Sequence, residues 1–301
     1  SGVTEKPVPS LLQGFSAPVH LKQDLSESQL NFLIRYDKDP YVRWNACQKL
    51  YTETILDLVR MMQENKEPFL KNEVIETFQA ILESDETDKA FMAEMLILPS
   101  EGELCDRMAV IDIDTVHAAR EFVLKEISEN LKDLFLKIFN DHQNSGPYSL
   151  DIKSVGFRKL KNTALFYVGN RKTKDSEKRV VDEFENAGNM TDEYSALSII
   201  THVAGDIRSL ALKRFYDKWK MDSLVLNKWF SVQAVSKLPG TLENVKALTG
   251  HADFSWKEPN KVRALLSSFF HMNLKAFHVV SGEGYRFLAD NIITMNEINP
   301  S

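Results

Sequence analysis

Helical periodicity extends through almost the whole chain and strongly limits what it can fold into. From Ser26 onward, apolar residues recur three and four positions apart, which places them on one face of an α-helix. The first such face, Leu30, Leu33 and Ile34, follows a capping-box spacing from Ser26 to Gln29. We predict an all-α protein with helices at about 26–36, 40–64, 71–83, 87–97, 115–141, 151–169, 175–187, 191–204, 207–219, 223–236, 241–249, 259–271 and 284–296.

The connections between these helices are short and contain helix breakers such as Pro99, Pro147 and the pair Pro239–Gly240. About a dozen helices cannot all pack around one core of ordinary size, whereas antiparallel pairs stacked into a superhelix can. No consensus repeats at a fixed period. We therefore predict an irregular HEAT/armadillo-like superhelix of antiparallel helix pairs.

The first 24 residues have a different character. Pro9, Gly14 and Pro18 disfavour helix, while Leu11 and Phe15 supply apolar anchors, a composition typical of a short extended element. A lone strand cannot form a sheet. We predict that residues 1–24 are the tail of a preceding β-sandwich domain and that residues 25–301 form the helical domain.

Composition excludes several classes of function. Hydrophobic residues make up 43% and charged residues 27%, as in ordinary globular proteins. The net charge is −6 and the basic residues are dispersed, so nucleic acid is not an expected partner. No apolar run reaches the length of a membrane span, and no signal peptide opens the chain, so no membrane partner is expected. The two cysteines, Cys47 and Cys105, fall inside helical patterns and favour buried thiols in a reducing, cytoplasmic compartment.

No catalytic or metal-binding motif is found. None of the seven histidines is part of a His-Glu-x-x-His pair, and neither a nucleophile elbow nor a phosphate-binding glycine loop occurs. The sequence Asp112-Ile113-Asp114 has the form of a metal clamp, but we interpret Asp114 as the cap of the 115–141 helix. We predict no catalytic residue, no metal and no cofactor in this chain.

Five segments carry a resemblance to a known family, in matching order and spacing. They are PSLLQGFSAPV (9–19), RYDKDPYVRWNACQKL (35–50), AGNMTDEYSAL (187–197), YDKWKMDSLVLNKWFSVQA (216–234) and PNKVRALLSSF (259–269). Together they resemble the C-terminal part of the aminopeptidase N family, the alanyl aminopeptidases of the zinc gluzincin class. The resemblance covers nearly the whole chain. It implies a helical superhelix that follows a β-sandwich domain, with the catalytic zinc domain upstream.

The resemblance also implies a substrate channel. The helix that carries Asn260 and Arg263 is expected to face the cavity that leads to the active site, where Arg263 could hold a peptide carboxylate or carbonyl. An ordinary exposed arginine on an amphipathic helix remains the alternative. Asn299-Pro300-Ser301 has the form of a further helix start, and the resemblance places Asn299 and Ser301 near the pocket for the first side chain of the substrate.

We therefore expect the C-terminal domain of a cytoplasmic zinc aminopeptidase that removes N-terminal amino acids from peptides. The domain would cap the active-site cavity and limit substrate size. Its partners would be its own catalytic and β-sandwich domains and peptide substrates. The chain opens with Ser-Gly rather than Met, so we expect a domain cut from a longer protein, inactive alone and without stoichiometric zinc. The alternatives are a free-standing helical-repeat scaffold for protein–protein interaction and, less favoured, an enzyme built on a helical bundle.

Overall fold

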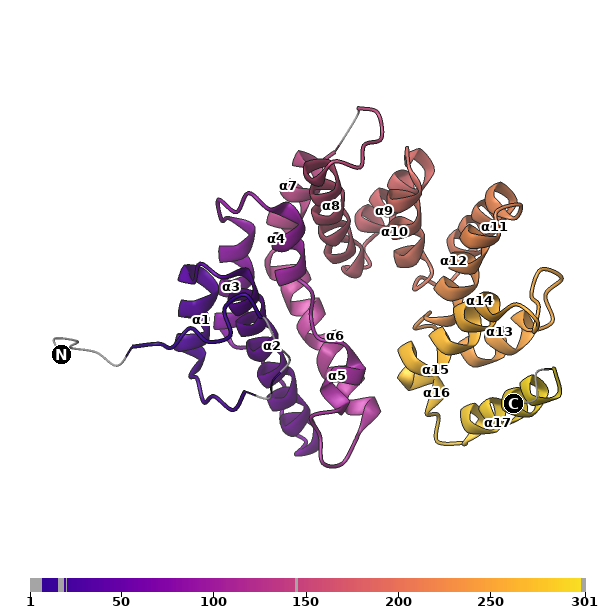
Figure 1. The fold of residues 1–301 in the computed structure, drawn as a ribbon, viewed down its shortest axis with the longest axis horizontal. Helices are drawn as coiled ribbons and strands as arrows, with labels where there is room; N and C mark the ends of the chain where they lie inside the picture. Colours follow the sequence, from indigo (N-terminus) through magenta and orange to yellow (C-terminus); the bar gives the residue numbers. More distant parts are fainter. Residues whose placement is uncertain (1–6, 16–18, 20, 144–145, 299–301) are drawn as a thin grey trace. The chain divides into compact units, whose positions relative to one another are not determined.

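The computed structural model describes residues 7–15, 19, 21–143 and 146–298. Every regular element within these residues is a helix, which confirms the all-α prediction (Figure 1). None of these helices combines the length and the apolar character needed to cross a bilayer. The helices are α1 (Glu27–Tyr36), α2 (Pro40–Gln63), α3 (Asn72–Leu82), α4 (Lys89–Met95), α5 (Glu101–Cys105), α6 (Ile113–Asn130), α7 (Lys132–Asp141), α8 (Ile152–Asn170), α9 (Lys174–Asn186), α10 (Met190–Ile200), α11 (Asp206–Trp219), α12 (Ser223–Ala234), α13 (Thr241–Leu248), α14 (Pro259–Val262), the π-helical turn η1 (Arg263–Ser267), α15 (Ser268–Met272), α16 (Leu274–Phe277) and α17 (Glu283–Ile298).

The chain divides into two compact units. The first comprises Ser1–Ser100 and Ala118–Arg171, and the second comprises Glu101–His117 and Lys172–Ser301. In the first unit α1 packs on α2, and both α4 and α7 pack on α8. In the second unit α9 packs on α10, while α12 contacts α11, α13, η1 and α15. Each unit therefore has its own set of helix–helix contacts and its own core.

Aromatic rings form the centre of the first core. Tyr51, Phe78, Phe135 and Tyr167 are all essentially inaccessible to solvent. The Phe135 and Tyr167 rings stack with centroids 4.3 Å apart, and Phe78 lies between the two tyrosines at 5.1 and 5.8 Å. Each fully buried ring contributes about 1.5–3 kcal/mol through removal of apolar surface from water. These side chains join α2, α3, α7 and α8.

Two aromatic groups organise the second unit. In the first group, Phe215, Trp229 and Phe230 are buried. Phe269 and Phe270 then meet the Phe287 ring at 6.4 and 5.9 Å, which holds α17 against α15.

The helix starts follow their sequence signals. Ser26 caps α1 in a capping box with Gln29, as predicted. Pro40 is the first residue of α2, and the carboxylate of Asp39 accepts the backbone N–H of Val42 at 3.0 Å. Each of these helix starts depends only on residues within one turn, so it forms independently of how the helix packs on the rest of the protein.

The predicted helix at 115–141 is wrong in two respects. It is interrupted at Leu131, which separates α6 from α7. Ser128 Oγ donates to the Leu124 carbonyl at 2.7 Å, and Asn130 Nδ2 donates to the Glu126 carbonyl at 2.8 Å; such back-bonding competes with the helical ladder and bends helices. The start lies earlier than predicted because Asp112, and not Asp114, accepts the backbone N–H of Thr115 at 3.1 Å.

Other departures concern short or unusual elements. The predicted helix at 259–271 is α-helical at both ends but contains the π-helical turn η1 in the middle. Helices α5 and α16 were not predicted, because five and four residues are too few to show a period.

The N-terminal segment is not a continuous extended element. A turn joins Leu12 to Phe15, whose backbone N–H donates to the Leu12 carbonyl at 3.0 Å, and Gly14 within it has φ +66°. The segment is attached to the start of α2, since Gly14 N–H donates to Asp39 Oδ2 at 2.7 Å and the Phe15 ring stacks on Tyr41 at 4.3 Å. Its proposed origin in a preceding β-sandwich domain stays a prediction.

Candidate functional site

Arg263 lies at the first residue of the π-helical turn η1, directly after α14. Its side chain is exposed, and Nη1 donates to Asn260 Oδ1 at 3.4 Å. Neighbouring Lys261 is instead neutralised by Glu258, with Nζ and Oε1 3.1 Å apart. Within the part of the chain that the structure describes, Arg263 has no carboxylate partner. The structure thus brings Asn260 and Arg263 together, as the sequence predicted.

This pair has a defined chemical capability. A guanidinium without a carboxylate partner presents parallel N–H donors to a carbonyl or carboxylate, and the Asn260 amide beside it adds a donor and an acceptor. π-Helical turns are rare in proteins, and a large share of those that occur lie at functional sites. The two other predicted channel residues, Asn299 and Ser301, lie outside the described residues, so their placement stays a prediction.

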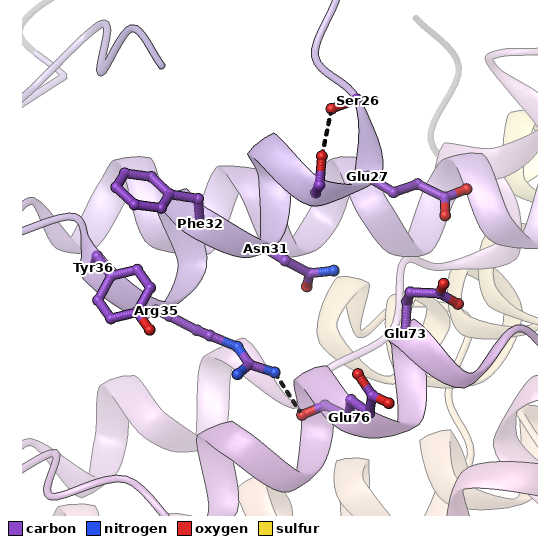
Figure 2. A pocket seen from close by; sticks show the side chains of 9 residues that line it. Ser26, Glu27, Asn31, Phe32, Arg35, Tyr36, Glu73 and Glu76 are labelled. Carbon is purple, nitrogen blue, oxygen red and sulfur yellow. Dashed lines mark hydrogen bonds between the residues drawn. The ribbon is translucent and has the colours of Figure 1, made fainter. Parts of the chain in front are cut away.

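A second candidate, absent from the sequence-based predictions, is an open groove between α1 and α3 (Figure 2). Its volume is about 730 Å³. Ser26 and the exposed face of α1 line one side, and two glutamates of α3 line the other. The lining residues are Ser26, Glu27, Ser28, Asn31, Phe32, Arg35, Tyr36, Glu73 and Glu76.

The groove combines exposed rings with excess negative charge. Glu27 forms an ion pair with Lys71, and this hydrogen bond raises the pKa of the lysine. Arg35 donates to the backbone carbonyl of Glu76 at 3.5 Å and not to a carboxylate. Over the described ranges, neither Glu73 nor Glu76 has an ion-pair partner. A sequence signal did exist, because Phe32 and Tyr36 are large apolar residues outside the Leu30–Leu33–Ile34 stripe.

The described residues do not fit a zinc ion. They contain no group of three or more His, Cys, Asp or Glu side chains placed to hold a metal. His117 Nδ1 lies 2.7 Å from Glu101 Oε1. Two such ligands do not form a zinc site. No metal-dependent step is therefore assigned to these side chains.

Known proteins resemble this chain over nearly its full length. Aminopeptidase N of Haemophilus influenzae is 36% identical over 299 residues, and that of Escherichia coli is 34% identical over 295 residues. These matches cover 99% and 98% of this chain but only 34% of each relative, so the chain spans about a third of the curated relatives it matches. A crystal structure of Legionella pneumophila aminopeptidase A in complex with aspartic acid superposes with a TM-score of 0.89 at 33% identity, covering 99% of this chain and 35% of that one.

The family model matches residues 27–301 and confirms the armadillo-like prediction, since its description specifies ARM repeats. Both the sequence relatives and the structural neighbour are aminopeptidases. The chain is therefore a member of the family described as "Domain of unknown function (DUF3458_C) ARM repeats", and it is homologous to the C-terminal part of aminopeptidase N.

Proposed function

We propose that this chain is the C-terminal helical domain of a zinc-dependent aminopeptidase that removes N-terminal amino acids from peptides. One observation carries the proposal: 98–99% of the chain aligns with aminopeptidases N of two species, and the alignments occupy only 34% of each relative. The remaining two thirds would provide the catalytic and β-sandwich domains. Zinc, which activates water in such enzymes, would be bound in the catalytic domain.

We propose that the helical domain excludes folded proteins from the active-site cleft. A helical cap over the zinc cleft would admit flexible peptides and reject folded proteins, and it would keep bulk water from the cavity. The cytoplasmic location expected from the two free cysteines belongs to the same proposal.

Arg263 and Asn260 are proposed to line the path of the substrate. The Arg263 guanidinium lacks a carboxylate partner over the described part of the chain, so a peptide carboxylate or carbonyl could accept its hydrogen bonds without first displacing an ion pair. Asn260 would hold the guanidinium in position at 3.4 Å. Asn299 and Ser301 remain proposed members of this channel from the resemblance alone.

The test uses the complete polypeptide that contains this chain. We expect it to release alanine from alanine p-nitroanilide and from flexible peptides, and to lose this activity when zinc is chelated. A folded protein with an accessible N-terminal alanine should be resistant until it is unfolded. Equal rates on the folded and unfolded forms would contradict the cap. If the complete polypeptide consisted of this helical domain alone and had no peptidase activity, the alternative of a free-standing scaffold for protein–protein interaction would be favoured.

The channel role of Arg263 has its own test. In the complete enzyme, Arg263→Ala should raise KM for tri- and tetrapeptides severalfold while leaving KM for alanine p-nitroanilide nearly unchanged, since only the longer substrates reach the guanidinium. Arg263→Lys should restore part of the loss because the charge returns without the planar fork. Lys275→Ala removes an exposed charge from the same unit and serves as the control. Identical effects of the two alanine substitutions would exclude a channel role.

A further inference from the structure

We infer that the groove between α1 and α3 is a docking surface for a lysine- or arginine-bearing segment of the polypeptide that precedes this chain in the enzyme. The inference rests on the proposed function, because it requires the upstream domains. It goes further by naming the surface, the chemistry of the contact and the kind of side chain that fits it.

The apolar part of the surface consists of two rings on α1. Phe32 is 50% exposed and Tyr36 is 67% exposed, and their centroids lie 5.2 Å apart. Both line the groove, at the end of α1 that lies away from Glu73 (Figure 2). Leu30, Leu33 and Ile34 fill the core instead. Two adjacent exposed rings provide apolar area that a partner can cover, and such patches are typical of interaction sites.

The charge of the groove selects the partner. Glu73 and Glu76 extend from α3 toward the groove, opposite α1 (Figure 2). Arg35 forms an ion pair with neither of them, because its guanidinium donates to the Glu76 backbone carbonyl. With three glutamates and one arginine, the lining keeps an excess of negative charge. A lysine or arginine of the docked segment would gain from the carboxylates, while other side chains of the same segment cover the rings.

The entry point of the chain favours an intramolecular partner. Ser26 caps α1 and also lines the groove, so the polypeptide enters the helical domain at the edge of this surface. The segment before it is attached to the same unit through Gly14 on Asp39 and Phe15 on Tyr41. An upstream segment joined to the domain through this chain would meet the groove intramolecularly, at an effective concentration on the order of millimolar, well above that of a second copy.

Site-specific crosslinking in the complete polypeptide tests the inference. Phe32→p-benzoylphenylalanine places a photoreactive ring in the groove, and mass spectrometry of the digested product identifies what it reaches. We expect an intramolecular crosslink to a lysine- or arginine-bearing segment upstream of this chain. The pair Glu73→Lys and Glu76→Lys should lower its yield severalfold. Asp133→Lys is the matched control, because Asp133, like Glu73, is an exposed acid in the first turn of a helix of the same unit.

Each outcome has one meaning. A crosslink between two copies, no crosslink in a protein with native circular dichroism, or a yield that Asp133→Lys lowers as much as the glutamate pair does would overturn the inference. Peptidase activity measured on the same samples separates the two proposals. An active enzyme without the upstream crosslink retains the proposed function and loses only the docking surface, whereas an inactive complete polypeptide contradicts the proposed function itself.

Discussion

The hydroxyls of Tyr51 and Tyr167 donate hydrogen bonds to two successive backbone carbonyls, those of Met95 at 3.1 Å and Leu96 at 2.6 Å. The two tyrosines come from α2 and α8, and the carbonyls belong to the end of α4. The last carbonyls of a helix have no intrahelical partner, and burial away from water makes each costly to leave unpaired. The tyrosines therefore satisfy the C-terminus of α4 inside the core of the first unit.

Tyr167→Phe should lower the free energy of unfolding by about 1–3 kcal/mol, because the Leu96 carbonyl stays buried and loses its donor. Urea unfolding followed by circular dichroism measures the loss, and hydrogen exchange should show faster exchange at the end of α4. Tyr36→Phe is the control, since Tyr36 is 67% exposed. Equal stability of Tyr167→Phe and the parent protein would mean that the Leu96 carbonyl finds another donor.

The ion pair between Arg43 and Glu86 joins α2 to the connection before α4. Arg43 Nη1 lies 2.6 Å from Glu86 Oε2, Nε donates to the Ile34 carbonyl at 3.0 Å, and the two side chains are only 16% and 18% exposed. Burial acts to raise the pKa of Glu86, but hydrogen bonds from Arg43 and from the Asp88 backbone outweigh it, so the pKa lies below the usual value of 4.5. The charged form of Glu86 is thus favoured in the folded state.

Glu86→Gln should cost about 1.5–3 kcal/mol at neutral pH, the range for a hydrogen bond to a charged group. Because the folded pKa lies below the unfolded one, this stabilisation is fully present above pH 4.5 and is lost as the pH falls through the folded pKa. The stability difference between the parent protein and Glu86→Gln should accordingly shrink on acidification. A difference that stays constant between pH 7 and pH 3 would show that packing, and not charge, accounts for the cost.

The fold could be predicted from sequence where the signal is local. The capping box at Ser26 and the apolar stripe of α1 depend on residues within two turns of one another, and the structure has them as expected. The break at Leu131 could not be predicted, since the apolar stripe continues through it and only the side-chain hydrogen bonds of Ser128 and Asn130 mark it. The π-helical turn at Arg263 was missed for the same reason: the spacing of buried Leu265, Leu266 and Phe269 also fits an α-helix.

The two candidate sites also differ in how far they could be predicted from the sequence. Asn260 and Arg263 are neighbours on one helical segment, so their proximity follows from spacing, while their role came from a family resemblance and stays a proposal. The groove depends on Phe32 and Glu76, which are far apart in sequence and come together only because α1 packs against α3. The sequence shows that Phe32 lies outside the apolar stripe of α1, but it contains no signal that pairs this side chain with Glu76.

The two cysteines should differ in reactivity. Cys47 is completely buried in α2, and burial raises the pKa of its thiol to about 12. Burial and the nearby Glu101 and Asp106 also raise the pKa of Cys105, which ends the five-residue helix α5. Because the thiolate is the reactive form, iodoacetamide at pH 8 should label neither rapidly, and Cys105 should react before Cys47 as its short helix opens locally. Mass spectrometry at timed intervals measures the order. Labelling of Cys47 in the native protein at the rate of a free thiol would contradict its burial.

Gly284 holds α17 in contact with α16, and no larger residue fits there. A Cβ at this position would lie 1.9 Å from the backbone oxygen of Phe277 and 2.8 Å from its carbonyl carbon, a contact that the backbone cannot relieve by rotating a side chain. Gly284→Ala should therefore displace α17, separate Phe287 from Phe269 and Phe270, and cost about 3 kcal/mol or more. Hydrogen exchange should rise along α17 first.

Gly188→Ala provides the comparison within the same unit. A Cβ at Gly188 meets nothing within 4 Å and the backbone needs no positive φ, so this substitution should change stability by less than about 0.5 kcal/mol. If Gly284→Ala unfolded at the same urea concentration as Gly188→Ala, with α17 equally protected, the close approach of α17 to the Phe277 carbonyl would not exist in solution. The expected gap between the two alanine variants therefore measures how firmly the last helix of the described chain is packed.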